Sequence, residues 1–167
     1  MSKSRESEAV RDMRTAAEWH REIQQVNGDA PNSILFTIPD NEWLTANKKL
    51  HWAEKSRRAR ALRERAHYQS LNALRRGTLK PAYGRVRVIA GIQYRTSRSD
   101  PNNVSDTVKH LIDGMVDAGV FVDDAWQYLV GPDMRRVAGR PPKGTHTIAI
   151  MIEEIGGEKD GDLRKSV

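Results

Sequence analysis

The chain contains no cysteine. Disulfide bonds, thiolate zinc sites and cysteine nucleophiles are therefore excluded. Long hydrophobic runs are also missing, and the longest clean one, from Ile148 to Ile152, is far too short to cross a bilayer. The glycine-rich patterns of nucleotide-binding loops and the nucleophile elbow of serine hydrolases do not occur. Nucleotide binding and hydrolase triads consequently have no support in this sequence.

The amount of apolar sequence indicates one folded domain. Of the 167 residues, 38% are hydrophobic, which suffices for a single modest core. We expect this domain over residues 34–155, with a helical or partly disordered extension at 1–33 and a disordered tail at 156–167. The polar start does not resemble a secretory signal. These features predict a soluble, cytoplasmic protein that does not enter a membrane.

Positive charge is concentrated in one segment of the chain. Between Asn47 and Lys80 there are 11 Lys and Arg residues against two Glu, an excess of +9, so the rest of a chain of net charge +6 carries −3. Such clustering is typical of a surface that neutralises a polyanion, although a solvated helix face gives the same pattern. The candidate phosphate-binding residues are Lys48, Lys49, Arg57, Arg58, Arg60, Arg63, Arg65, Arg95 and Arg98.

Apolar periodicity predicts the order of the elements. Short apolar or alternating runs indicate strands over 34–38, 85–94, 126–130 and 145–152. Helical periodicity covers 54–74, which Gly77 should end, and the amphipathic run from Val104 to Val116, which Asn103 should cap. The expected fold is α/β (α+β), with a small mixed β-sheet of about four strands and two main packed helices.

Acidic residues flank the second predicted helix. Asp100 and Asn102 precede it, and Asp123 and Asp124 follow it directly before the next strand. If the strands on either side of this helix are neighbours, both acidic ends should meet at one edge of the sheet. Carboxylate and amide oxygens are suitable Mg²⁺ ligands, and a bound Mg²⁺ can activate water against a phosphodiester. Each residue could equally be an ordinary turn residue, since Asp-Pro often opens a turn.

One lysine lies close to this predicted metal site along the chain. Lys109 falls in the second turn of the helix, where its positive charge could reach a phosphate or an attacking water. Lys109 and Asp113 are four residues apart and also fit a plain surface pair of a helix. The combined order of strand, acidic loop, helix, acidic pair and strand favours the functional interpretation.

These motifs resemble the RusA family of Holliday-junction resolvases. The matching residues are Arg98-Ser99-Asp100-Pro101-Asn102-Asn103, then Lys109, Asp113, Ala118-Gly119 and Val122-Asp123-Asp124. The resemblance covers roughly residues 34–155 and is specific only between residues 98 and 124. It implies a homodimeric, Mg²⁺-dependent endonuclease, with Mn²⁺ as an alternative ion, that places paired symmetric nicks in four-way DNA junctions.

The resemblance also implies a set of site residues. The family's metal ligands fall on Asp100, Asn102 and Asp124, with Asp123 beside the last, and its catalytic lysine falls on Lys109. Family members are often encoded by phages, which implies a role in the cytoplasm of a bacterial host.

The sequence departs from the family pattern at two points. Asn102 replaces an acid and removes a negative charge, and the spacing to Lys109 is about one helical turn longer. Asp106, in the first turn, is a candidate for the missing carboxylate. Two other functions therefore stay open: a branched-DNA-binding protein with weakened or no cleavage, and a non-enzymatic basic interaction protein.

Overall fold

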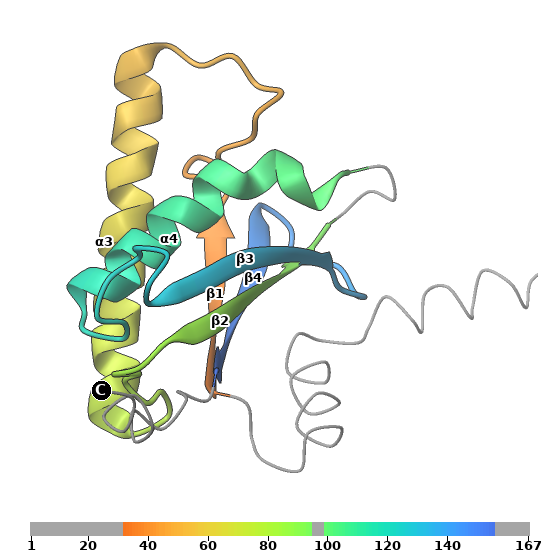
Figure 1. The fold of residues 1–167 in the computed structure, drawn as a ribbon. Coiled ribbons are helices and arrows are strands. Elements are labelled where there is room, and N and C mark those ends of the chain that lie inside the picture. Colours follow the sequence, from red (N-terminus) through yellow and green to blue (C-terminus); the bar gives the residue numbers. More distant parts are fainter. Residues whose placement is uncertain (1–31, 95–98, 156–167) are drawn as a thin grey trace, which may run out of the picture.

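Four strands and two long helices make up the described part of the chain, residues 32–94 and 99–155 of the computed structural model (Figure 1). In order they are β1 (Asn32–Pro39), α3 (Trp52–Arg76), β2 (Val86–Gln93), the short 3₁₀ helix η1 (Pro101–Val104), α4 (Ser105–Asp117), β3 (Leu129–Arg136) and β4 (Thr145–Glu154). The predicted small mixed sheet with two packed helices is confirmed. The predicted N-terminal extension before residue 32, the tail from 156, and Arg95 and Arg98 lie outside the described residues.

The sheet has the order β1-β4-β2-β3. Strand β4 pairs antiparallel with both of its neighbours, whereas β2 and β3 run parallel. A parallel pair requires a crossover connection, and α4 forms it between β2 and β3. The chain therefore leaves the sheet at the end of β2 and re-enters it at the start of β3, which is the opposite end of the sheet.

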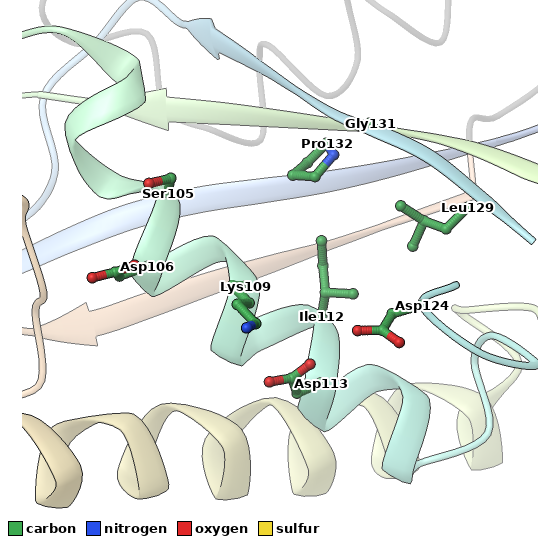
Figure 2. Close-up of a pocket in the computed structure, with 9 residues that line it drawn as sticks. All are labelled: Ser105, Asp106, Lys109, Ile112, Asp113, Asp124, Leu129, Gly131 and Pro132. Carbon is green, nitrogen blue, oxygen red and sulfur yellow. The ribbon is translucent and has the colours of Figure 1, made fainter. Parts of the chain in front are cut away.

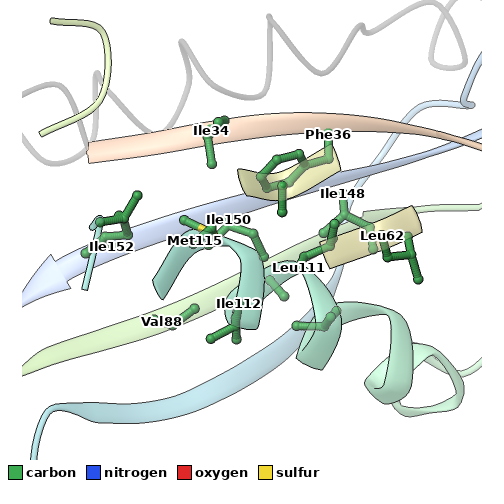
Figure 3. Close-up of a cluster of buried hydrophobic side chains, with 14 of the residues drawn as sticks. Ile34, Phe36, Leu62, Val88, Leu111, Ile112, Met115, Ile148, Ile150 and Ile152 are labelled. Carbon is green, nitrogen blue, oxygen red and sulfur yellow. The ribbon is translucent and has the colours of Figure 1, made fainter. Parts of the chain in front are cut away.

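One hydrophobic core joins the sheet to both helices. Alternate residues of the strands, such as Phe36, Val88 and Ile150, are fully buried because successive side chains of a strand point to opposite faces. They pack in the same cluster as Leu62 of α3 and Leu111 of α4 (Figure 3). Packing against a common core fixes the direction of α4 across the sheet.

The two helices approach closely at one glycine. A Cβ atom on Gly114 would lie 2.2 Å from the carbonyl oxygen of Arg63 and 2.7 Å from the Cβ of Ala66. No side chain fits at such distances, so glycine is required by packing, although it is a poor helix former. This contact sets the position of α4 against α3.

The ends of the elements confirm some expectations and correct others. Gly77 ends α3 with φ of +73°, as predicted. Asn103 does not cap α4, because η1 intervenes and the Asp100 side chain caps η1 by accepting from the Asn102 N–H at 2.9 Å. The predicted strand over 126–130 is displaced to Leu129–Arg136.

The displacement of β3 has a local cause. A register shift between Arg87 and Ile89 of β2 leaves one extra residue on β3, next to the Gly131–Pro132 bond. Proline has no N–H to donate and is tolerated in edge strands and bulges, and β3 is an edge strand. Pro132 is therefore compatible with β3, although proline usually ends a strand.

Among the described residues, no helix combines the length and apolarity needed to cross a membrane.

Gly114→Ala tests the helix crossing. Alanine is the better helix former by about 1 kcal/mol, but here its Cβ would collide with backbone, and overpacking typically costs about 1–3 kcal/mol. We expect a net loss of up to about 2 kcal/mol in the free energy of unfolding, measured by urea denaturation. Gly84→Ala is the control, since a Cβ there meets no atom within 4 Å. A Gly114→Ala protein more stable than the parent would contradict the crossing.

Candidate metal-binding groove

A groove of about 320 Å³ runs between α4 and β3. Asp106, Lys109 and Asp113 line it from α4, and Asp124 lines it from the loop that leads into β3 (Figure 2). Its apolar side is formed by Ile112, Leu129 and Pro132. The groove thus places three carboxylates and one amine beside an apolar surface.

The periodicity of α4 explains why these residues share one face. Asp106, Lys109 and Asp113 are spaced by three and four residues, which is one stripe of an α-helix. Val108, Leu111 and Met115 occupy the stripe that faces the core and are fully buried. Burial of the apolar stripe therefore turns the acidic stripe towards β3.

The surroundings of Asp124 disfavour the ionised form of its carboxyl group. Its pKa is raised above the ordinary value, first by a hydrogen bond with the side chain of Asp123, then by partial desolvation and by the negative charge of Asp113. Figure 2 shows the carboxylates of Asp113 and Asp124 lying close to each other at one end of the groove. A cation between them would relieve this repulsion.

The remaining groove carboxylates have cationic or neutral neighbours. Asp106 forms an exposed ion pair with Lys55 of α3, with 3.3 Å between Nζ and Oδ2. His110 Nδ1 lies 3.7 Å from Asp113 Oδ2. Burial lowers the pKa of His110 despite the nearby carboxylates, so this imidazole is neutral at pH 7. His110 therefore does not act as a full counterion to Asp113 at pH 7.

The structure brings together only some of the predicted site residues. Lys109 and Asp124 share the groove, and Asp123 precedes it on the surface, where its Oδ1 accepts from the Asp124 N–H at 2.7 Å. Asp100 and Asn102 are not among the groove residues. We expected the two acidic segments to meet at one edge of the sheet if the strands on either side of the helix were neighbours. Strands β2 and β3 are neighbours, but the two segments do not meet, so this prediction is wrong.

The parallel direction of β2 and β3 explains this difference. The Tyr94 hydroxyl donates to the Asp100 carbonyl at 3.2 Å, so Asp100 lies beyond the last residues of β2. Asp124 lies before the first residue of β3, and β3 pairs with β2 in register from Val86 opposite Leu129. The two acidic segments are therefore separated by the length of α4. In the described part of the chain, no group of three or more His, Asp or Glu residues has the arrangement of a complete metal site.

Asp113 was not predicted as a groove residue. Its distance of four residues from Lys109 suggested an ordinary surface pair. The spacing of seven residues from Asp106 was the available signal, because two helical turns bring both carboxylates to the same face. What the sequence did not show was that Asp124 faces this stripe.

The basic face of α3 is largely neutralised within the domain. Arg58 was expected on the exposed face but is only 9% exposed, and it donates to Glu54 and to the carbonyl oxygens of Asp40 and Trp43. Arg65 makes two hydrogen bonds to Glu42, and Arg57 makes two to Glu54.

A further arginine joins the two helices. Arg63 makes two hydrogen bonds to Asp117 of α4, and this guanidinium lowers the pKa of the carboxyl. Arg60, Lys48 and Lys49 are exposed, and within the described residues none of them forms an ion pair or a side-chain hydrogen bond. Of the predicted phosphate-binding residues that are described, these three retain an uncompensated charge.

No protein-family model matches the chain, and no curated protein matches it.

Arg58 and Arg60 form a matched pair for separating structure from binding. Arg58→Ala leaves the buried Trp43 carbonyl without its donor and removes one of the two guanidinium partners of Glu54, and we expect a loss of about 2–4 kcal/mol in the free energy of unfolding. Arg60→Ala should change the same quantity by less than about 0.5 kcal/mol. Chemical denaturation of both variants measures this difference, and equal stabilities would contradict the structural role of Arg58.

The Asp124 titration can be measured by NMR of its carboxyl carbon. We expect a pKa above the ordinary aspartate value, a clear decrease in Asp123→Asn and a smaller decrease in Asp113→Asn, in the order of the causes. Because the folded-state pKa is raised, Asp124 contributes stability at low pH that is lost as the pH rises through that pKa. Asp124→Asn should remove this loss. An unchanged Asp124 pKa in Asp123→Asn would contradict the coupling.

Proposed function

We propose that the protein is a Mg²⁺-dependent endonuclease that cuts branched DNA at the groove between α4 and β3. The observation that carries the proposal is the facing pair of carboxylates, Asp113 and Asp124, with Lys109 on the same stripe of α4. The motifs shared with RusA-type resolvases support DNA four-way junctions as the substrate.

The groove suits a hard divalent cation. Mg²⁺ usually keeps several waters and binds through one or two carboxylates together with substrate phosphates, so an incomplete protein ligand set is sufficient. The pKa of Asp124 is raised by its hydrogen bond with Asp123, by desolvation and by the charge of Asp113, and a bound cation would relieve the repulsion between these carboxylates. Asp113 and Asp124 are therefore the proposed ligands, with Asp106 farther along the same stripe. When bound, Mg²⁺ would supply water activation and charge stabilisation for phosphodiester hydrolysis.

The remaining groove residues have separate proposed roles. Lys109 holds a positive charge beside the carboxylates, where it can bind a phosphate oxygen and stabilise the charge of the transition state. His110 lies 3.7 Å from Asp113 through Nδ1 and Oδ2, and because burial lowers its pKa it adds little positive charge to the groove. Ile112, Leu129 and Pro132 exclude water from one side of the groove and thereby strengthen these charge interactions.

This ligand set differs from the one that the family resemblance implies. Asp100 and Asn102 would be ligands by resemblance, but the Asp100 side chain caps η1 at the other end of α4. Asp124 and Lys109 belong to both sets. The two ligand sets therefore differ in whether Asp100 or Asp113 binds the metal.

The resemblance further suggests a homodimer that cuts two strands of a junction symmetrically. Two-fold symmetry of the protein would match that of the junction and place one groove on each cut strand. A second candidate is a junction-binding protein without cleavage. It is favoured by the neutral Asn102 and by the absence of a complete three-residue metal cluster in the described chain.

The test uses a labelled four-way junction and a matched linear duplex, each with Mg²⁺ or with EDTA. We expect Mg²⁺-dependent nicks in the junction only. Asp113→Asn and Asp124→Asn should lower the nicking rate on the order of 100-fold, as loss of groups that stabilise transition-state charge does. Asp100→Asn should keep most of the activity, because asparagine is an equally good cap.

The variants separate the alternatives. Loss of nicking in Asp100→Asn but not in Asp113→Asn would replace the proposed ligand set with the one implied by resemblance. Tight junction binding without nicks, in Mg²⁺ and in Mn²⁺, would identify the cleavage-deficient binder. Equal binding of the junction and the duplex, without nicks, would contradict both functions.

A further inference from the structure

Large aromatic side chains are exposed at one end of the molecule. Tyr83 is 80% exposed and Trp126 is 74% exposed, and Tyr128 follows at 37%. Only 6% of the chain is aromatic, so three exposed rings in two neighbouring loops are a considerable share of its aromatic side chains. Exposed apolar side chains that gather in one place are typical of a contact surface, whereas single exposed ones are ordinary.

The two loops that carry these rings are held together by backbone hydrogen bonds. The Ala82 N–H donates to the Val120 carbonyl at 2.8 Å, and the Val86 N–H donates to the Tyr128 carbonyl at 2.7 Å. Residues 77–85 and 118–128 thus form one surface in spite of their distance in the sequence. We call the set Tyr83, Trp126 and Tyr128 the aromatic end.

The aromatic end adjoins the acidic groove. Asp124 lies two residues before Trp126, and Leu129, which lines the groove, directly follows Tyr128. A strand of nucleic acid with its phosphate in the groove would therefore bring its neighbouring bases towards these rings.

Uncompensated positive charge lies at the same end. Four exposed cations belong to the end of α3 and the connection to β2 (Figure 1): Arg75, Arg76, Lys80 and Arg85. Within residues 32–94 and 99–155, none of the four forms an ion pair or a side-chain hydrogen bond. They contrast with Arg58 and Arg65, whose charges are neutralised inside the domain.

We propose that the aromatic end binds unstacked nucleobases, with Tyr83 and Trp126 as stacking platforms and the four cations as phosphate contacts. Aromatic rings bind any base through its π-face, and basic side chains track the backbone. A continuous duplex offers no free base face, whereas a branch point or a single-stranded arm does. The placement of the cut strand rests on the proposed function, but base binding itself does not.

Binding is measured by fluorescence anisotropy in EDTA, so that hydrolysis plays no part. The probes are labelled twelve-residue oligothymidylate, oligouridylate of the same length, and a blunt duplex hairpin. We expect single strands to bind more tightly than the hairpin, and the ratio of the DNA and RNA arms identifies the preferred strand. Tyr83→Ala and Trp126→Ala should each weaken single-strand binding by about fivefold or more, with little effect on the hairpin.

Trp52→Ala is the matched control. Trp52 is 76% exposed, but it begins α3, about 36 Å along the helix from Arg76. Its removal should leave single-strand binding unchanged. Equal affinities for all three probes, or equal losses in Trp52→Ala and Trp126→Ala, would overturn the proposal.

Two further measurements separate base binding from catalysis and from the binding of another protein. Intact single-strand binding in Asp124→Asn, together with lost nicking, would support the aromatic end independently of catalysis. If Trp126→Ala instead dissociates an oligomer in sedimentation experiments and leaves oligonucleotide affinity unchanged, the rings bind protein and base stacking is refuted.

Discussion

Strands β2 and β3 run parallel, and α4 must therefore cross the sheet between them. This one constraint determines which polar residues can meet. It places Asp100 and Asp124 at opposite ends of α4 and leaves the middle of α4 facing the loop before β3. The close contact at Gly114 then fixes the helix against α3. Groove, helix stripe and acidic loop all depend on that crossover.

Electrostatic pairing inside the domain changes the meaning of the charge distribution. The segment with an excess of +9 contains arginines whose partners come from other parts of the chain, such as Glu42 for Arg65 and Asp117 for Arg63. A charge with a bidentate carboxylate partner attracts a polyanion much less than a free one. Free charge lies instead on Arg60, on Lys48 and Lys49, and on the exposed cations at the end of α3 and in the connection to β2.

The sequence predicted the local features of the fold, because those depend on neighbouring residues. Apolar periodicity placed α3, α4 and most strands, and Gly77 marked a helix end correctly. Strand direction depends on long-range pairing, which no local pattern encodes, so Asp100 and Asp124 were wrongly expected to converge. One partner of Arg58 is likewise remote: the Trp43 carbonyl accepts a hydrogen bond from its Nη1. The helical position of Asp113 was predictable from the sequence, but its proximity to Asp124 across the groove was not.

An acidic groove and the proposed polyanionic substrate would repel each other, and the arrangement of this domain offers a solution. Asp113 and Asp124 are the proposed cation ligands, while the cations at the end of α3 and in the connection to β2, and the rings of Tyr83 and Trp126, lie outside the groove. Affinity for the strand would then come from surfaces that do not compete with the metal ligands. Since the two kinds of contact are spatially separate, the proposed binding and hydrolysis should be removed by different substitutions.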